Sequence, residues 1–157
     1  MNHYELVVRA EKWLKDQACG VVFRDDFRAT TTSGEQPDAI GFRSGVSILV
    51  ECKASRSDFL ADKKKKFRLD SNLGMGDWRF FMCEPGVITP ADLPLGWGLI
   101  YALPKQIKKV QGVPGNGHWL SKKPFQGNKG SEMQMMYSAL RRMEIRGHLD
   151  DIYEKLY

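Results

Sequence analysis

Cysteine is scarce in this sequence of 157 residues, which has only Cys19, Cys52 and Cys83. Their number is odd, they are widely spaced, and no pair has the spacing of a CxxC motif. A disulfide framework and a cysteine-based zinc site are therefore not expected. This cysteine usage is typical of a reducing compartment, and we expect a cytoplasmic protein.

Histidine is equally scarce, and His3, His118 and His148 are scattered along the chain. Their spacing fits neither a zinc site nor a Ser-His-Asp triad. A P-loop, a GxGxxG motif, a signal-peptide pattern and an apolar run near the roughly 20 residues of a membrane span are also missing. Neither nucleotide-driven chemistry nor a membrane-bound protein is expected.

Charge of both signs is plentiful, because 24 Lys and Arg accompany 19 Asp and Glu and leave a net charge of +5. The resulting pI near 9.1 suits a polyanionic partner such as nucleic acid without requiring one. A hydrophobic content of 42% is enough for one core, and the chain is too short for two ordinary domains. We expect a single domain over residues 1–157.

Hydrophobic periodicity and turn residues predict an alternation of helices and strands. The expected elements are a helix at 4–16, a strand at 21–23, a hairpin of 37–42 with 46–54, a helix at 55–69, strands at 78–83 and 97–103, and a helix at 131–145. This order predicts an α/β fold with a central mixed β-sheet flanked by helices. Residues 112–131 read as a flexible, basic, glycine-rich loop, and the methionine stripe of the last helix reads as core packing.

The hairpin contains two acids and a lysine inside otherwise apolar runs. Side chains alternate along a strand, so Glu51 and Lys53 should share one face while Cys52 points to the other. If Ser44 and Gly45 form a two-residue turn, Arg43 pairs with Val46, and Asp38 falls opposite Glu51. A four-residue loop keeps this register, whereas a three- or five-residue loop separates the acids.

Directly opposed residues have Cβ atoms about 5 Å apart, and two carboxylates this close repel unless a cation lies between them. Oxygen ligands without a nearby histidine favour Mg²⁺, with Mn²⁺ as a possible substitute. Such an ion polarises a phosphoryl oxygen and activates water, and Lys53 can orient that water or stabilise negative charge. The expected substrate is a phosphodiester. An ordinary surface ion cluster is the alternative.

The motif of Pro37 and Asp38 followed by Glu51, Cys52 and Lys53 resembles the signature of the PD-(D/E)XK nuclease superfamily. The preceding helix with Glu5, the hairpin and the basic helix extend the resemblance over residues 4–83. Residues 50–68 and 79–102 are similar to MmcB-like DNA-repair nucleases and, more distantly, to Holliday-junction resolvases. The resemblance implies a restriction-endonuclease-like core and a metal-dependent DNA endonuclease of repair or recombination.

The resemblance also assigns roles to individual residues. It implies that Asp38 and Glu51 bind the metal, that the Cys52 backbone carbonyl completes the site, and that Lys53 is the catalytic lysine. Glu5 would match the helix-borne acid of the family, although the helix dipole also favours glutamate in a first turn.

Basic and aromatic residues near the motif are candidates for nucleic-acid contact. Arg56 is placed to grip a phosphate or to form a surface salt bridge. The four consecutive lysines are Lys63, Lys64, Lys65 and Lys66. They could contact phosphates or form a solvated helical face, and Lys63 could extend from an apolar stripe. Trp119 and Phe125 could stack on bases or hold their loop to the core.

Two functions of different classes fit these observations. The first is the DNA endonuclease, and the alternative is a non-catalytic nucleic-acid-binding or protein-interaction module on a nuclease-like fold. Intact acids and lysine favour the enzyme. The sequence leaves open the choice between DNA and RNA, the strand structure and the oligomeric state, although a junction-cutting role would favour a two-fold homodimer.

Overall fold

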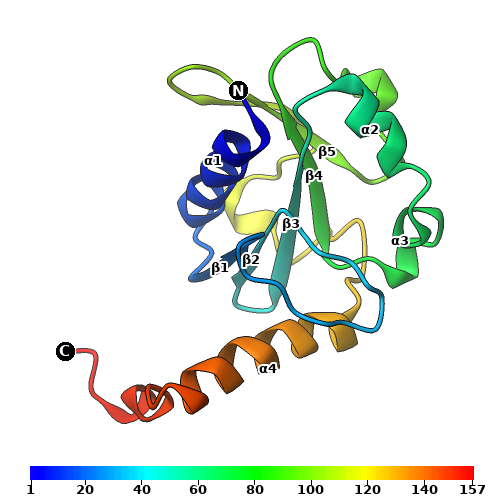
Figure 1. The fold of residues 1–157 in the computed structure, drawn as a ribbon. Helices are drawn as coiled ribbons and strands as arrows, with labels where there is room; N and C mark the ends of the chain where they lie inside the picture. Colours follow the sequence, from blue (N-terminus) through cyan, green and yellow to red (C-terminus); the bar gives the residue numbers. More distant parts are fainter.

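The computed structural model describes residues 1–157 and contains one mixed sheet of six strands in the order β1-β2-β3-β4-β5-β6 (Figure 1). The strands are β1 (Val21–Arg24), β2 (Ala39–Arg43), β3 (Val46–Cys52), β4 (Trp78–Cys83), β5 (Gly98–Ala102) and β6 (Ile107–Gln111). The pairs β3–β4 and β4–β5 are parallel, and the other neighbouring pairs are antiparallel. The predicted α/β fold with a central mixed sheet flanked by helices is confirmed.

Four α-helices surround this sheet: α1 (His3–Asp16), α2 (Arg56–Asp62), α3 (Lys66–Leu69) and α4 (Lys129–Ile145). Short 3-10 turns, η1 to η4, lie at Ser71–Leu73, Pro90–Asp92, Asn116–His118 and Leu149–Tyr153. None of the helices combines the length and apolar character that crossing a membrane requires.

The expected helix at 55–69 is in fact two helices. It starts as predicted, because the Ser55 side chain accepts a hydrogen bond from the Asp58 backbone. The helix α2 then ends at Asp62, and Lys65 adopts an extended backbone before α3 begins. Consecutive lysines place like charges three residues apart on a helix, which destabilises a continuous helix across them.

The two faces of the sheet carry separate cores. On one face, α1 buries its predicted stripe, consisting of Leu6, Val7, Ala10, Trp13 and Leu14. On the other face, Leu49 of β3 belongs to a core that includes Phe59 of α2 and Met135 of α4. Because successive strand residues alternate between these cores, Glu51 lies on the face that α2 and α3 cover.

The edge strand β6 was missed by the sequence analysis. Its sequence is IKKVQ, in which Lys108 and Lys109 are exposed and Ile107 and Val110 are only half-buried. An edge strand needs just one partner, here β5, so it forms without the apolar run that identifies a central strand.

The loop before α4 is fixed to the sheet by aromatic packing. Trp119 is buried, with its ring centroid 5.1 Å from that of Trp78, and its backbone carbonyl accepts a hydrogen bond from the Trp78 indole. Phe125 is half-buried beneath the Arg79 guanidinium, 4.0 Å from its ring centroid. Of the two roles considered for these aromatic residues, the geometry matches that of holding the loop to the core.

Polar contacts anchor the first turn of α4 in the protein. The Asn128 side chain caps it, Lys129 pairs with Asp77 at 2.8 Å, and Glu132 accepts a hydrogen bond from Ser47. Further along the helix, Arg142 donates to the Arg28 carbonyl at 2.8 Å, and the C-terminal end of α4 extends away from the sheet (Figure 1).

The expectation that the methionine stripe of this helix packs into the core was wrong. Its side chains are exposed, including Met133 (66%), Met136 (37%), Tyr137 (67%) and Leu140 (51%). A helical apolar stripe predicts a face that avoids water and does not reveal whether the same chain covers it.

Candidate active site

The hairpin register brings the two predicted acids together. Arg43 pairs with Val46 across a two-residue turn, and Ala39 pairs with Val50. Gly45 has a positive φ of 75°, which this tight turn requires and glycine adopts without strain. When this register is continued by one residue beyond Ala39 and Val50, Asp38 lies beside Glu51, as predicted. The backbone N–H of Cys52 donates to Asp38 Oδ2 at 2.8 Å and fixes that carboxyl at the site.

Burial and mutual repulsion dominate the electrostatics of this acidic pair. The Asp38 side chain is 15% exposed and that of Glu51 is 4% exposed. Burial and the neighbouring Glu51 carboxylate raise the pKa of Asp38 from 3.8 to about 8. A carboxyl held neutral in this way is one that a nearby cation would ionise.

Lys53 extends from the same face of β3 into the site, as the alternation of side chains predicted. It is buried, and its Nζ lies 3.9 Å from Glu51 Oε2 and 3.0 Å from Asp62 Oδ1. Asp62 comes from the last turn of α2, which follows β3 directly. The lysine is therefore held between the strand and the helix that covers it.

Arg68 of α3 links three buried carboxylates. Its guanidinium lies 2.7 Å from Glu35 Oε2, 2.8 Å from Asp62 Oδ2 and 3.2 Å from Glu51 Oε1. The same guanidinium also lies over the Trp97 ring, 4.7 Å from its centroid. This contact network fixes the orientation of Glu51 and, through Asp62, that of Lys53.

The pKa values of this cluster reflect opposing effects of burial and charge. Burial tends to lower the pKa of Arg68, but the three carboxylates outweigh it and raise that pKa above its ordinary value. For Asp62, burial is outweighed by Arg68 and Lys53, and its pKa is lowered. For Glu35, burial prevails over Arg68, and its pKa is raised.

The carboxyl groups of Asp38, Glu51 and Asp62 and the ammonium group of Lys53 line a cavity of about 300 Å³. The residues that line it are His3, Gln36, Asp38, Glu51, Cys52, Lys53, Asp58, Ala61, Asp62 and Lys65. Five of the predicted site residues thus share one cavity: Asp38, Glu51, Cys52, Lys53 and Lys65. The carboxylate oxygens of Asp38 and Glu51 are the donor type that Mg²⁺ and Mn²⁺ prefer, so this pair fits a hard dication.

Cys52 contributes to the site through its backbone. Its side chain belongs to the core on the α1 face, as alternation predicted, while its N–H binds Asp38. Glu5 is not among the cavity residues. Its carboxylate accepts from the Asn2 backbone at 2.7 Å and completes the capping box of α1, and the catalytic role expected for it stays a prediction.

The basic residues proposed for phosphate contact differ in their surroundings. Arg56 is half exposed and forms a two-pronged pair with Asp92, both contacts being 2.9 Å. Lys65 reaches Asp62 at 3.1 Å and lines the cavity, whereas Lys63 lies over the Phe59 ring. The remaining two of the four, Lys64 and Lys66, are exposed at the surface.

Four residues of this region were missed by the sequence analysis: His3, Glu35, Asp62 and Arg68. Glu35 lies in a polar loop, and Asp62 and Arg68 lie in the stretch predicted as one helix at 55–69. His3 has no partner in the sequence at a spacing typical of metal ligands. The partners of these residues come from other segments of the chain, so no local pattern identifies them.

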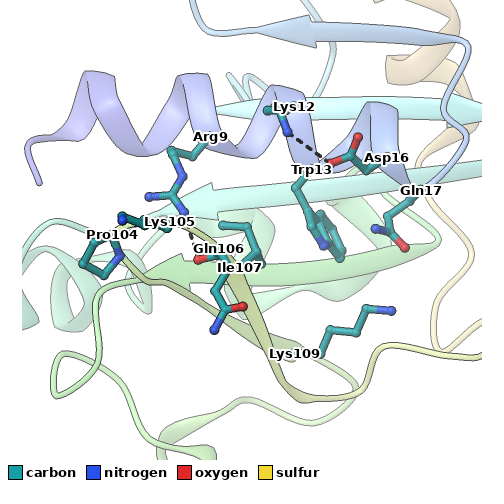
Figure 2. A pocket seen from close by; sticks show the side chains of 10 residues that line it. All are labelled: Arg9, Lys12, Trp13, Asp16, Gln17, Pro104, Lys105, Gln106, Ile107 and Lys109. Atoms are coloured by element: carbon teal, nitrogen blue, oxygen red, sulfur yellow. Dashed lines mark hydrogen bonds and ion pairs between the residues drawn. The ribbon is translucent and has the colours of Figure 1, made fainter.

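A larger cavity of about 450 Å³ lies between α1 and the β5–β6 connection (Figure 2). It is mainly basic, with Arg9, Lys12, Lys105 and Lys109 on its walls. Arg9 donates to the Gln106 carbonyl at 2.9 Å, and Lys12 pairs with Asp16. Because this cavity has one carboxylate and no acidic pair, it does not offer the metal chemistry of the smaller cavity.

Comparison with known proteins adds information about the fold alone. No protein-family model and no curated protein matches the sequence. A solved structure, the SPO1766 protein of unknown function from Silicibacter pomeroyi, is similar with a TM-score of 0.59 and 22% sequence identity. The similarity covers 100% of this chain and 98% of that chain, so the whole architecture is shared.

Proposed function

We propose that the protein is a metal-dependent endonuclease that hydrolyses DNA phosphodiester bonds, with a role in DNA repair or recombination. One observation carries the proposal: a buried pair of carboxyl groups, Asp38 and Glu51, shares a cavity with the ammonium group of Lys53. A non-catalytic protein has no physical need to maintain a repulsive acidic pair at the end of a buried strand.

Asp38 and Glu51 would hold Mg²⁺, or Mn²⁺ in its place, with the Cys52 carbonyl as a further ligand. When bound, the ion would polarise a phosphoryl oxygen and lower the pKa of a water ligand. Lys53 would stabilise the negative charge that develops on the phosphate, because its ammonium lies 3.9 Å from the Glu51 carboxylate. Arg68 and Asp62 would keep Glu51 and Lys53 in position.

DNA contact would come from the basic surface beside the cavity, formed by Lys63, Lys64, Lys65 and Lys66, together with Arg56 at the start of α2. Such contacts act mainly through charge and give affinity without sequence preference. A cytoplasmic location is part of the proposal, since Cys19, Cys52 and Cys83 are all free thiols, as suits a reducing compartment.

Cleavage of labelled nucleic acids tests the proposal. The panel contains single-stranded, duplex, nicked and branched DNA and the matching RNAs, with Mg²⁺, Mn²⁺ or chelator. We expect metal-dependent cleavage that Glu51→Gln and Lys53→Met each reduce by about 10² or more, with DNA affinity nearly unchanged. Glu11→Gln, in α1, is the matched control and should cleave normally. Activity retained in Glu51→Gln would contradict the proposal.

A second candidate is a non-catalytic nucleic-acid-binding or protein-interaction module, and the exposed apolar face of α4 favours it. This face continues into a wholly apolar cavity of about 280 Å³ against the sheet, lined by Val21, Phe23, Phe42, Met136, Ala139, Leu140 and Met143. A homodimer, in which the same face of two copies meets around a two-fold axis, would cover it. Wild-type protein that binds DNA but cleaves no substrate with either metal would favour this candidate.

A further inference from the structure

His3 lies at the mouth of the cavity, where three separate elements meet. It is the first residue of α1, whose start is fixed by the Asn2–Glu5 capping box. Asp25 follows β1, and its backbone N–H donates to the Asp38 carbonyl at 2.9 Å. His3 Nε2 lies 3.0 Å from Asp25 Oδ2 and 3.4 Å from Asp38 Oδ1. One ligand atom from each residue lies within 4.8 Å of the other two.

The two oxygens of the Asp38 carboxyl have different neighbours. Its Oδ2 accepts from the Cys52 backbone, whereas its Oδ1 faces His3. Exposure rises outward, from 15% for the Asp38 side chain to 28% for Asp25 and 49% for His3. An ion could therefore enter from solvent and meet an imidazole nitrogen and two carboxylates without displacing a buried group.

We propose that His3, Asp25 and Asp38 form a site for a first-row transition-metal dication and that this site binds Mn²⁺ more tightly than Mg²⁺. The inference deepens the proposed function and rests on it, because Asp38 belongs both to this group and to the Asp38–Glu51 pair. An imidazole ligand favours transition metals, whereas Mg²⁺ prefers oxygen ligands alone. The choice of ion at the cavity thus depends on a residue outside the PD and ECK motif.

The competing explanation is a surface ion pair between a protonated His3 and the two aspartates. Such a pair adds little to stability and has no selectivity among dications. The two explanations differ in what a nitrogen-free side chain at position 3 does to Mn²⁺ binding. His3→Gln keeps a polar side chain of similar length at an exposed helix start, so folding should be preserved.

Metal titration of the full chain distinguishes these explanations without an activity assay. Isothermal titration with Mn²⁺ and, separately, Mg²⁺ is carried out on wild type, His3→Gln, Asp25→Asn and the control His118→Gln, which alters an exposed histidine elsewhere. We expect His3→Gln and Asp25→Asn to weaken Mn²⁺ binding by about tenfold or more, with a smaller effect of His3→Gln on Mg²⁺. Pulsed electron paramagnetic resonance of bound Mn²⁺ should show coupling to a histidine nitrogen that is lost in His3→Gln and kept in the control.

The possible outcomes separate this inference from the proposed function. If wild type binds both ions and His3→Gln changes neither affinity nor the nitrogen coupling, the His3 site is refuted while the Asp38–Glu51 site stands. If wild type binds neither ion, both proposals are refuted. If His3→Gln weakens Mn²⁺ and Mg²⁺ equally, His3 has no part in ion selection and the inference is overturned.

Discussion

The raised pKa of Asp38 predicts that the metal-free protein loses stability as the pH rises. In the folded protein the pKa is about 8, against 3.8 for an ordinary aspartate. Between these values the folded chain binds a proton that the unfolded chain has released. Stability attributable to this group is therefore complete below about pH 4 and falls until about pH 8, by at most about 1.4 kcal/mol per pH unit.

Asp38→Asn isolates this contribution. The amide cannot ionise, yet its oxygen can still accept the hydrogen bond that Cys52 N–H donates to Asp38 at 2.8 Å. The free energy of unfolding is measured from urea titrations, followed by tryptophan fluorescence in chelator, at several values from about pH 5.5 to about pH 8.5. We expect wild type to lose more stability with pH than the variant, with the difference ending near pH 8.

Added Mg²⁺ or Mn²⁺ should reverse the loss in wild type, most strongly at high pH, because the ion binds the ionised carboxylate. Asp16→Asn, which alters an exposed aspartate at the end of α1, should follow wild type and serves as the control. Equal pH slopes for wild type and Asp38→Asn would refute the reasoning, since Asp38 would then titrate as an ordinary carboxyl.

Three further predictions concern other parts of the molecule. Arg68→Leu should lower the free energy of unfolding by about 3 to 5 kcal/mol, because buried carboxylates would lose their shared cation; a urea titration showing less than about 1 kcal/mol would mean that water reaches the cluster. Lys64→Ala combined with Lys66→Ala should weaken DNA binding and reduce the slope of log K against log salt by about 1 to 2, and an unchanged slope would exclude phosphate contact. Leu140→Glu should change the stability of a monomer by no more than about 0.5 kcal/mol, whereas it should convert a dimer formed through α4 to single chains in light scattering.

The sequence predicted the hairpin at the centre of the site down to individual pairs. This was possible because a two-residue turn fixes the register and strand alternation fixes the faces, so both rules act locally on Asp38, Glu51 and Lys53. The α1 stripe was predictable for the same reason, since a helical period of 3.6 residues defines a buried face.

The rest of the site depends on contacts between distant segments. Glu35 and Arg68 are 33 residues apart in the sequence. His3 and Asp38 come together only because α1 packs on the sheet. Nothing in the local sequence of a polar loop or a run of lysines specifies such partners. The burial of the apolar face of α4 was predicted wrongly for a related reason. Apolar periodicity indicates that a helix face avoids water, but it does not identify the partner that covers this face.

The buried ion cluster has a consequence for the order in which ligands bind. Its three carboxylates are matched by three cations, the groups being Glu35, Glu51, Asp62, Lys53, Lys65 and Arg68. With Asp38 protonated, this cluster is formally neutral, and Asp58 on the cavity wall adds one negative charge, so the metal-free cavity repels a phosphodiester. A dication that displaces the Asp38 proton would add one net positive charge and cancel that excess. DNA affinity should therefore be higher in Ca²⁺ than in chelator, and the nucleic acid should join the site second, after the metal has removed the negative charge.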